Sequence, residues 1–106
     1  MSNHLLYSIA FSKIIGLNDK QRKLLLAHFS SAEIIYKERF NLHFPFEDVN
    51  DDFKKILLND WPWEETEREL AFMQKHDIHA TCIFDATYPD RLLHCDDAPT
   101  ILYVKG

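Results

Sequence analysis

Glycine is scarce in this sequence, which holds only Gly16 and Gly106 among its 106 residues. Phosphate-binding loops of the Walker and dinucleotide types need several closely spaced glycines, so the sequence excludes both. Long apolar runs are also missing, because stretches such as LLLA at 24–27 fall far short of the roughly 20 residues that span a bilayer. We therefore expect no cofactor and no membrane role.

Cysteine is scarce as well, and the chain has no recognisable secretory signal, which predicts free thiols in a reducing cytoplasm. Zinc needs about four convergent nitrogen or sulfur ligands, and the spacing of the histidines and cysteines fits no standard finger or ribbon. A glycine-rich oxyanion turn, the usual companion of a nucleophilic cysteine, is also missing. We expect a core thiol at Cys82, but no metal, no catalytic residue and no enzyme from the set His76, His79, Cys82, His94 and Cys95.

The sequence is rich in apolar and aromatic side chains, at 46% and 13% of the residues, which favours a folded core over intrinsic disorder. The formal net charge is −5, and it is unevenly spread. Residues 13–23 carry four bases and one acid, or +3, whereas residues 47–69 carry nine acids and three bases, or −6. A polyanion would have to meet the first region, and the overall acidity argues against strong DNA binding.

Apolar periodicity and capping signals predict helices in the first part of the chain. The first helix covers 3–15 and stops near Gly16, which suits the left-handed conformation that ends many helices. Asn18 and Gln21 form a capping box that opens a second helix over 19–29. We expect this helix to turn three apolar side chains inward: Leu24, Leu25 and Phe29.

A second capping box, Ser30 with Glu33, predicts a third helix that buries Ile34 or Ile35 together with Tyr36. Residues 41–50 then read as a crossing loop, pinned to the core by Phe44 and Phe46.

Two further helices follow this loop. Asp51 or Asp52 can cap the first of them over 53–60, and Pro62 suits the first turn of the next, over 62–76. One stripe of the last helix is predicted to be buried, with Phe72 beside it: Trp63, Thr66, Leu70 and Met73.

Strand patterns appear only near the C-terminal end, at 78–84 and 100–104. Because the second strand reaches Gly106 without a later partner, we expect a larger sheet to begin there. The predicted fold is therefore mainly α. A small helical domain of the SAM-like or helix-hairpin-helix kind occupies residues 1–77, and residues 78–106 form a connector with one or two short β-strands of a truncated α/β sheet.

Residues 11–29 resemble a helix-hairpin-helix element, with a glycine turn between two helices and basic side chains at the start of the second. Such a hairpin can bind a DNA phosphate through outward backbone amides at a helix N-terminus. The nucleic-acid-binding candidates are Gly16, Asn18, Lys20 and Lys23, with Asn18 in place of the usual second glycine. The alternative is a packing unit on which Lys20, Arg22 and Lys23 form a solvated face.

A second motif spaces tyrosine, proline, leucine, aspartate and glycine in a regular pattern: Tyr88, Pro89, Leu92, Asp96, Pro99 and Gly106. It is similar to the signature that leads into the Rossmann-like core of the DNA-processing protein A family, called DprA or Smf. Ala98 stands where a second proline is common in the family. The helical half resembles the family as well, with Ser30 at the position of a glycine in a phenylalanine-glycine-serine turn.

This resemblance implies a protein that binds incoming single-stranded DNA in natural transformation, forms a homodimer and loads the RecA recombinase. The DNA chemistry would belong mainly to a Rossmann-like part beyond Gly106, and the present residues would form an accessory domain that contacts DNA or protein. The alternative is a stand-alone protein-interaction module without DNA binding, which uses apolar surface such as Phe44, Phe46 or Trp61.

Overall fold

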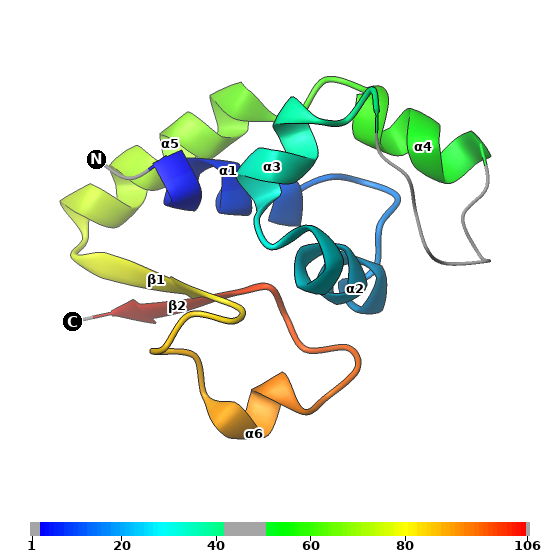
Figure 1. The fold of residues 1–106 in the computed structure, drawn as a ribbon. Helices are drawn as coiled ribbons and strands as arrows, with labels where there is room; N and C mark the ends of the chain where they lie inside the picture. Colours follow the sequence, from blue (N-terminus) through cyan, green and yellow to red (C-terminus); the bar gives the residue numbers. More distant parts are fainter. Residues whose placement is uncertain (1–2, 42–50, 106) are drawn as a thin grey trace.

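The computed structural model describes residues 3–41 and 51–105, which are mainly helical with one short antiparallel sheet, as the sequence predicts (Figure 1). The elements in chain order are α1 (Asn3–Ser12), α2 (Asp19–Phe29), α3 (Ala32–Lys37), α4 (Asp51–Leu58), α5 (Trp63–Lys75), β1 (Ile78–Cys82), α6 (Asp90–Leu93) and β2 (Ile101–Lys105). The predicted loop aromatics Phe44 and Phe46 lie outside the described residues, as do the side chains proposed to cap α4.

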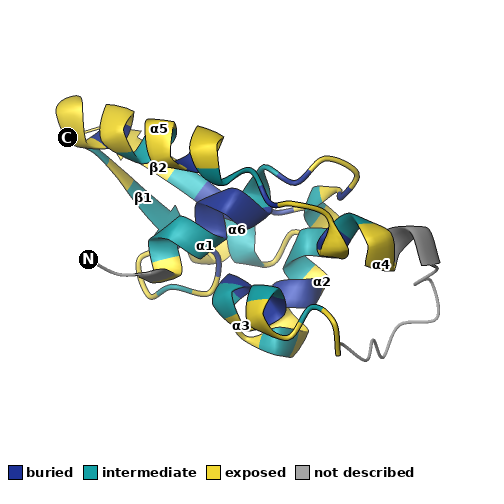
Figure 2. Cartoon of the chain, turned by 90° about the horizontal axis from the view of Figure 1, so that it is seen from above, coloured by how far each residue is buried: buried dark blue, intermediate teal, exposed yellow. Residues whose placement is uncertain are grey.

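Helix α1 is the centre of the molecule. Its residues Ile9, Ala10 and Phe11 have no exposed surface, because the helix contacts α3, α5 and both strands. Figure 2 shows buried residues gathered on α1, whereas the outer side of α5 is exposed. The helix ends at Ser12, earlier than predicted, and Gly16 then reverses the chain with φ +103°, as expected of a glycine here.

Helix α2 begins with the predicted capping box. The Asn18 side chain accepts a hydrogen bond from the Gln21 amide at 2.8 Å, and the Gln21 side chain accepts one from the Asn18 amide at 2.9 Å. The inward face was predicted wrongly at Leu24, which is 45% exposed, whereas Leu25 and Leu26 are buried. The prediction missed this because three consecutive leucines leave the direction of the helix face to tertiary contacts.

Helix α3 begins one residue later than predicted. The Ser31 hydroxyl, and not that of Ser30, accepts the hydrogen bond from the Ile34 amide. Ser30 instead ends α2 with φ +75°, a left-handed conformation that is incompatible with the extended backbone of an N-cap. Of the two isoleucines, Ile35 is buried and Ile34 is 45% exposed.

The apolar stripe of α5 lies as predicted, with Thr66 and Met73 buried and Trp63 and Leu70 partly buried. The Thr66 hydroxyl donates to the Pro62 carbonyl oxygen at 2.7 Å, which satisfies its buried oxygen inside the helix. Phe72, expected beside the stripe, is 55% exposed.

The two strands pair with each other in an antiparallel register that sets Cys82 opposite Ile101. The predicted terminal strand thus has a partner in β1, which ends two positions before the predicted Phe84. A β-turn follows, closed by a hydrogen bond of 3.0 Å from the Asp85 amide to the Cys82 carbonyl oxygen, with Phe84 at φ +72°. The Asp85 carboxylate in turn accepts a hydrogen bond of 3.0 Å from the Cys82 amide.

Helices and strands share their apolar cores. In one cluster Ile9 of α1 and Met73 of α5 pack with Cys82 and Ile101 of the strands. In the other, residues of α1, α2, α3 and α4 pack with Ile83, Tyr88 and Ala98. Both clusters cross the predicted boundary between residues 77 and 78. Across the described ranges, every helix is too short or too polar to cross a membrane.

Candidate functional site

The glycine turn of the hairpin is shaped by packing against α4. A Cβ atom added at Gly16 would lie 2.9 Å from Cδ1 of Ile56, a distance that side chains essentially never show. The positive φ of Gly16 independently disfavours any other residue. The turn is therefore the main reason for a glycine here, and the methyl group of Ile56, which ends a flexible side chain, adds a smaller steric cost.

The N-terminus of α2, where the hairpin would hold a phosphate, is already partly occupied by its own side chains. The capping box uses the amides of Asn18 and Gln21, two of the donors that an anion would need. Asp19 adds a carboxylate to the same turn and pairs with Arg22 at 3.2 Å. A phosphate would therefore meet a negative charge and fewer open donors than at an uncapped helix end.

Three of the four cations in residues 13–23 are held by fixed partners. The Lys23 ammonium donates to the carbonyl oxygens of Leu93 at 2.5 Å and Cys95 at 2.8 Å, so it ties α2 to the end of α6. Arg22 donates to the Ile14 carbonyl oxygen at 2.9 Å, and Lys13 pairs with Glu69 at 3.1 Å.

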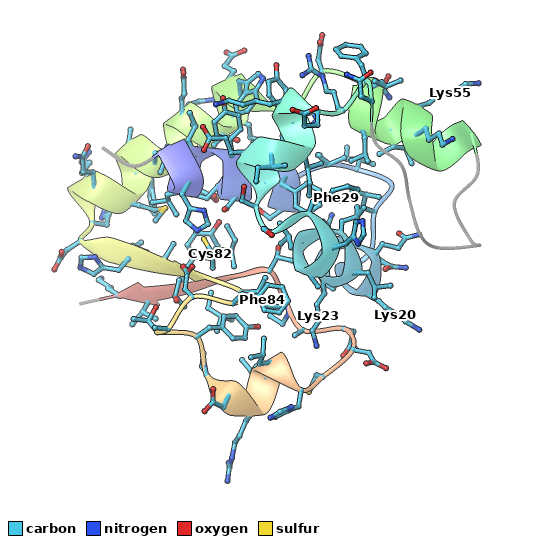
Figure 3. All side chains as sticks on the ribbon, in the orientation of Figure 1. Lys20, Lys23, Phe29, Lys55, Cys82 and Phe84 are labelled. Atoms are coloured by element: carbon cyan, nitrogen blue, oxygen red, sulfur yellow. The ribbon has the colours of Figure 1, made fainter. Side chains whose placement is uncertain are left out.

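Lys20 is the cation of the hairpin that faces solvent. Its side chain points away from the body of the chain, whereas Lys23 points toward the segment around α6 (Figure 3). The structure therefore places Gly16, Asn18 and Lys20 at one exposed turn and directs Lys23 elsewhere. Neither Arg22 nor Lys23 belongs to the solvated face of the alternative interpretation.

The tyrosine-proline motif folds into a stapled connector. The Tyr88 side chain is buried, and its hydroxyl donates to the Pro99 carbonyl oxygen at 2.7 Å. Burial raises the pKa of this phenol, so Tyr88 is a neutral donor at physiological pH. Pro89 precedes the first residue of α6, and Leu92 packs against the core. Asp96 is exposed, and Gly106 lies outside the described residues.

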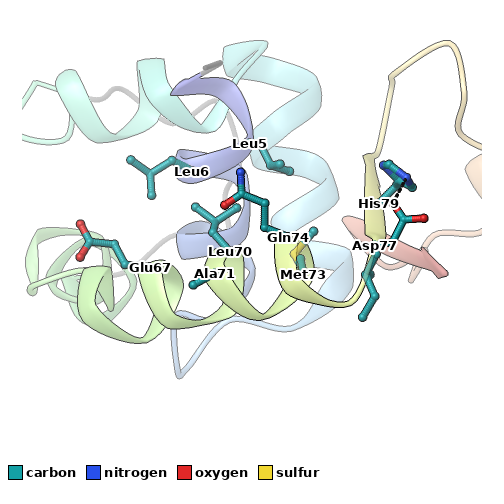
Figure 4. A pocket seen from close by; sticks show the side chains of 10 residues that line it. Leu5, Leu6, Glu67, Leu70, Ala71, Met73, Gln74, Asp77 and His79 are labelled. Atoms are coloured by element: carbon teal, nitrogen blue, oxygen red, sulfur yellow. Dashed lines mark ion pairs between the residues drawn. The ribbon is translucent and has the colours of Figure 1, made fainter. Parts of the chain in front are cut away.

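A groove of about 560 Å³ lies between α1, α5 and the start of β1 (Figure 4). The helices contribute Leu5 and Leu6 from α1 and mainly apolar residues from α5, while Glu67 and Asp77 supply negative charge at its walls. The sequence did not predict this groove, because Leu70 and Met73 were assigned to the buried stripe of α5. The full lining is Leu5, Leu6, Glu67, Leu70, Ala71, Met73, Gln74, Asp77, Ile78 and His79.

The histidines and cysteines considered for zinc lie apart from one another. His79 pairs with Asp77 at 3.3 Å, His76 packs on Phe72, and Cys95 is an exposed thiol. Cys82 is buried, as predicted, and burial raises the pKa of its thiol.

The neighbours of Cys82 were not anticipated. Its sulfur lies beside a nitrogen of His4 and a carboxylate oxygen of Asp85, all within 4.8 Å of one another. His4 carried no signal in the sequence, because only the tertiary fold brings the start of α1 to the end of β1.

The comparisons with protein-family models, curated proteins and solved structures found no match for this chain. Its function must therefore be inferred from the residues described above.

Proposed function

We propose that this chain is the N-terminal part of a cytoplasmic, non-enzymatic DNA-processing protein of the DprA kind, which binds single-stranded DNA and loads RecA. Within that protein, residues 1–106 form an architectural and protein-contact domain, and the main DNA surface lies elsewhere. The observation that carries this assignment is the position of Lys23. Its ammonium group, which would suit a DNA phosphate, is bonded instead to the carbonyl oxygens of Leu93 and Cys95.

Two details support the resemblance on which the DprA assignment rests. Ser30 stands where the family has a glycine, and it adopts φ +75°, the region that glycine occupies most readily. Two residues of the signature bond to each other, because the Tyr88 hydroxyl donates to the Pro99 carbonyl oxygen. The spacing between Tyr88 and Pro99 therefore has a structural reason, because it brings the hydroxyl to the carbonyl oxygen.

The charge distribution favours a weak DNA contact at most. With a net charge of −5 and most hairpin cations paired internally, few counterions would be released when a DNA strand binds. Lys20 alone reaches at most a single phosphate, which is insufficient for tight binding.

The groove between α1 and α5 favours a protein contact instead. Its apolar lining suits an aliphatic or aromatic side chain, whereas Glu67 and Asp77 would repel a phosphate backbone. The protein-contact surface proposed from sequence must be revised, because Trp61 is only 3% exposed and belongs to the core.

The decisive test is fluorescence anisotropy of labelled single-stranded and duplex DNA, titrated with the chain at low and moderate salt. We expect weak binding at low salt that disappears as salt rises, because a contact made by few cations is readily screened. Lys20→Glu should abolish the residual binding. Lys75→Glu is the matched control, because Lys75 is an exposed lysine in the last turn of α5.

Tight binding that persists at moderate salt would contradict the proposal that the main DNA surface lies outside residues 1–106. Equal loss with Lys20→Glu and Lys75→Glu would show that only net charge matters, and would remove the hairpin as a contact. Lys23→Glu is not a clean test of DNA binding, because it also breaks the link between α2 and α6.

Protein contact is tested by sedimentation velocity of the chain alone and with RecA added. Ala71→Glu places a charge in the groove at an exposed position, so it should weaken a complex formed there without unfolding the chain. Glu64→Ala, on the same helix but away from the groove, is the control. A chain that sediments as a monomer at high concentration, with no change when RecA is added, would contradict the protein-contact role.

A further inference from the structure

The side chains of His4, Cys82 and Asp85 converge at the point where α1 begins and β1 ends. One nitrogen, one sulfur and one carboxylate oxygen lie within 4.8 Å of one another. Cys82 and Asp85 are close in sequence, but His4 reaches them only through the packing of α1 against the strands. Imidazole, thiolate and carboxylate are all groups that bind zinc, whereas magnesium and calcium prefer oxygen alone.

The spacing of these atoms matches a metal site closely at one edge. Nitrogen and oxygen ligands about 2.0–2.1 Å from a tetrahedral zinc ion lie roughly 3.3 Å apart. His4 Nε2 and Asp85 Oδ1 lie 3.4 Å apart. A sulfur about 2.3 Å from the same ion would lie roughly 3.6 Å from each of them. All three atoms lie within 4.8 Å of one another, so the set is within about 1 Å of these ligand distances.

Contacts within the chain hold the Asp85 and Cys82 side chains in place. The second carboxylate oxygen of Asp85, Oδ2, accepts a hydrogen bond of 3.0 Å from the Cys82 amide, which leaves Oδ1 directed at His4. The Cys82 side chain is anchored in the core, where it packs with Ile9, Met73 and Ile101. Supporting contacts of this kind orient ligands in metal sites.

We propose that His4 Nε2, Cys82 Sγ and Asp85 Oδ1 bind one Zn²⁺ ion, with water in the fourth position. Binding displaces the proton of the Cys82 thiol to solvent, and the resulting thiolate forms the zinc–sulfur bond. The ion connects the first turn of α1 to the turn that follows β1. Its role is to fasten these two segments, and it is independent of the DNA and protein contacts proposed above.

The test is the stoichiometry and affinity of Zn²⁺ for the full chain, measured by competition with a chromophoric chelator under reducing conditions. Co²⁺ serves as a second probe, because a cysteine ligand produces a sulfur-to-cobalt charge-transfer band in the near ultraviolet. We expect one equivalent of zinc, this band in the cobalt protein, and a melting temperature that rises with zinc concentration.

The variants separate this site from other side chains that could hold a metal. His4→Gln and Asp85→Asn should each weaken zinc affinity by about tenfold or more. Asp85→Asn keeps an oxygen that can accept the hydrogen bond from the Cys82 amide, so the turn should be preserved. This variant therefore tests zinc ligation even if His4→Gln disturbs α1. His79→Gln is the matched control, because His79 of β1 pairs at 3.3 Å with Asp77, the residue before the strand, without a thiol. Cys95→Ser controls for the exposed thiol.

Retention of wild-type zinc affinity in both His4→Gln and Asp85→Asn would overturn the proposal. So would loss of zinc in His79→Gln or Cys95→Ser alone, or a cobalt protein without the sulfur band. Zinc binding that the two ligand variants lose and the two controls keep would establish the site.

Discussion

At the scale of single residues, Lys23 has the most consequential contacts. It donates to two backbone carbonyl oxygens across a sequence separation of about seventy residues. We expect Lys23→Met, which keeps the aliphatic stem but removes the ammonium, to lower the free energy of unfolding by about 2 kcal/mol, because charged hydrogen bonds contribute roughly 1.5–3 kcal/mol each and this site is only part-buried. The measurement is the urea midpoint and slope.

Lys20→Met is the matched control for this change, because it removes the same charge from the same helix at an exposed position. Its effect should remain within about 0.5 kcal/mol. Equal destabilisation by both substitutions would mean that the loss of charge, and not the link to α6, determines stability.

The environment of Tyr103 leads us to expect that stability falls at alkaline pH. Burial and the hydrogen bond of 2.7 Å that its hydroxyl donates to Glu69 raise the pKa of the phenol. Above the ordinary phenol pKa of about 10, the unfolded chain loses this proton while the folded chain keeps it, so rising pH favours unfolding. We expect the urea midpoint to fall as the pH rises above about 10, and to fall less steeply in Tyr103→Phe. Identical pH slopes in the two proteins would contradict this assignment.

At the scale of elements, the hairpin turn depends on a glycine and its neighbour. Gly16→Ala should lower the free energy of unfolding by about 2 kcal/mol, because it combines a left-handed backbone cost of roughly 1–2 kcal/mol with the contact at Ile56. In an Ile56→Val background, which lacks Cδ1, the same change should cost less. Urea unfolding of the four proteins measures the coupling, and strict additivity would show that the contact with Ile56 is unimportant.

The predictability of each element follows from how local its determinants are. The capping box of Asn18 and Gln21 was found from sequence because both partners lie within one helical turn. The start of α3 was misplaced because Ser30 and Ser31 offer the same hydroxyl, and only the backbone conformation of Ser30 distinguishes them. The partners of Lys23 and the neighbours of Cys82 could not be found in this way, because they come from distant segments that approach only in the folded chain.

At the scale of the whole molecule, the sheet and the helices are expected to unfold together. Ile101→Asp would bury a charge against Ile9 and Met73, which should lower the free energy of unfolding by about 3 kcal/mol or more. Val104→Asp is the control on the same strand, at a position that is 58% exposed. The measurement is the urea midpoint of the helices, followed by circular dichroism.

If Ile101→Asp leaves the urea midpoint of the helices unchanged, the chain consists of two independent units divided between residues 77 and 78. A lowered midpoint in Ile101→Asp, with Val104→Asp close to wild type, would show that the helical part depends on the strands. The shared cluster of Ile9, Met73, Cys82 and Ile101 leads us to expect the second result.

The central place of α1 also has a consequence for biosynthesis. Ile9 leaves the ribosome long before Cys82 and Ile101, its partners in the core. Until those residues emerge, α1, whose Ile9, Ala10 and Phe11 are fully buried in the folded chain, has an uncovered apolar side, and native contacts between such distant segments are slow to form. Helix α1 therefore has to be shielded from aggregation until the strands arrive, and chaperone demand should be greatest just before β2 emerges from the ribosome.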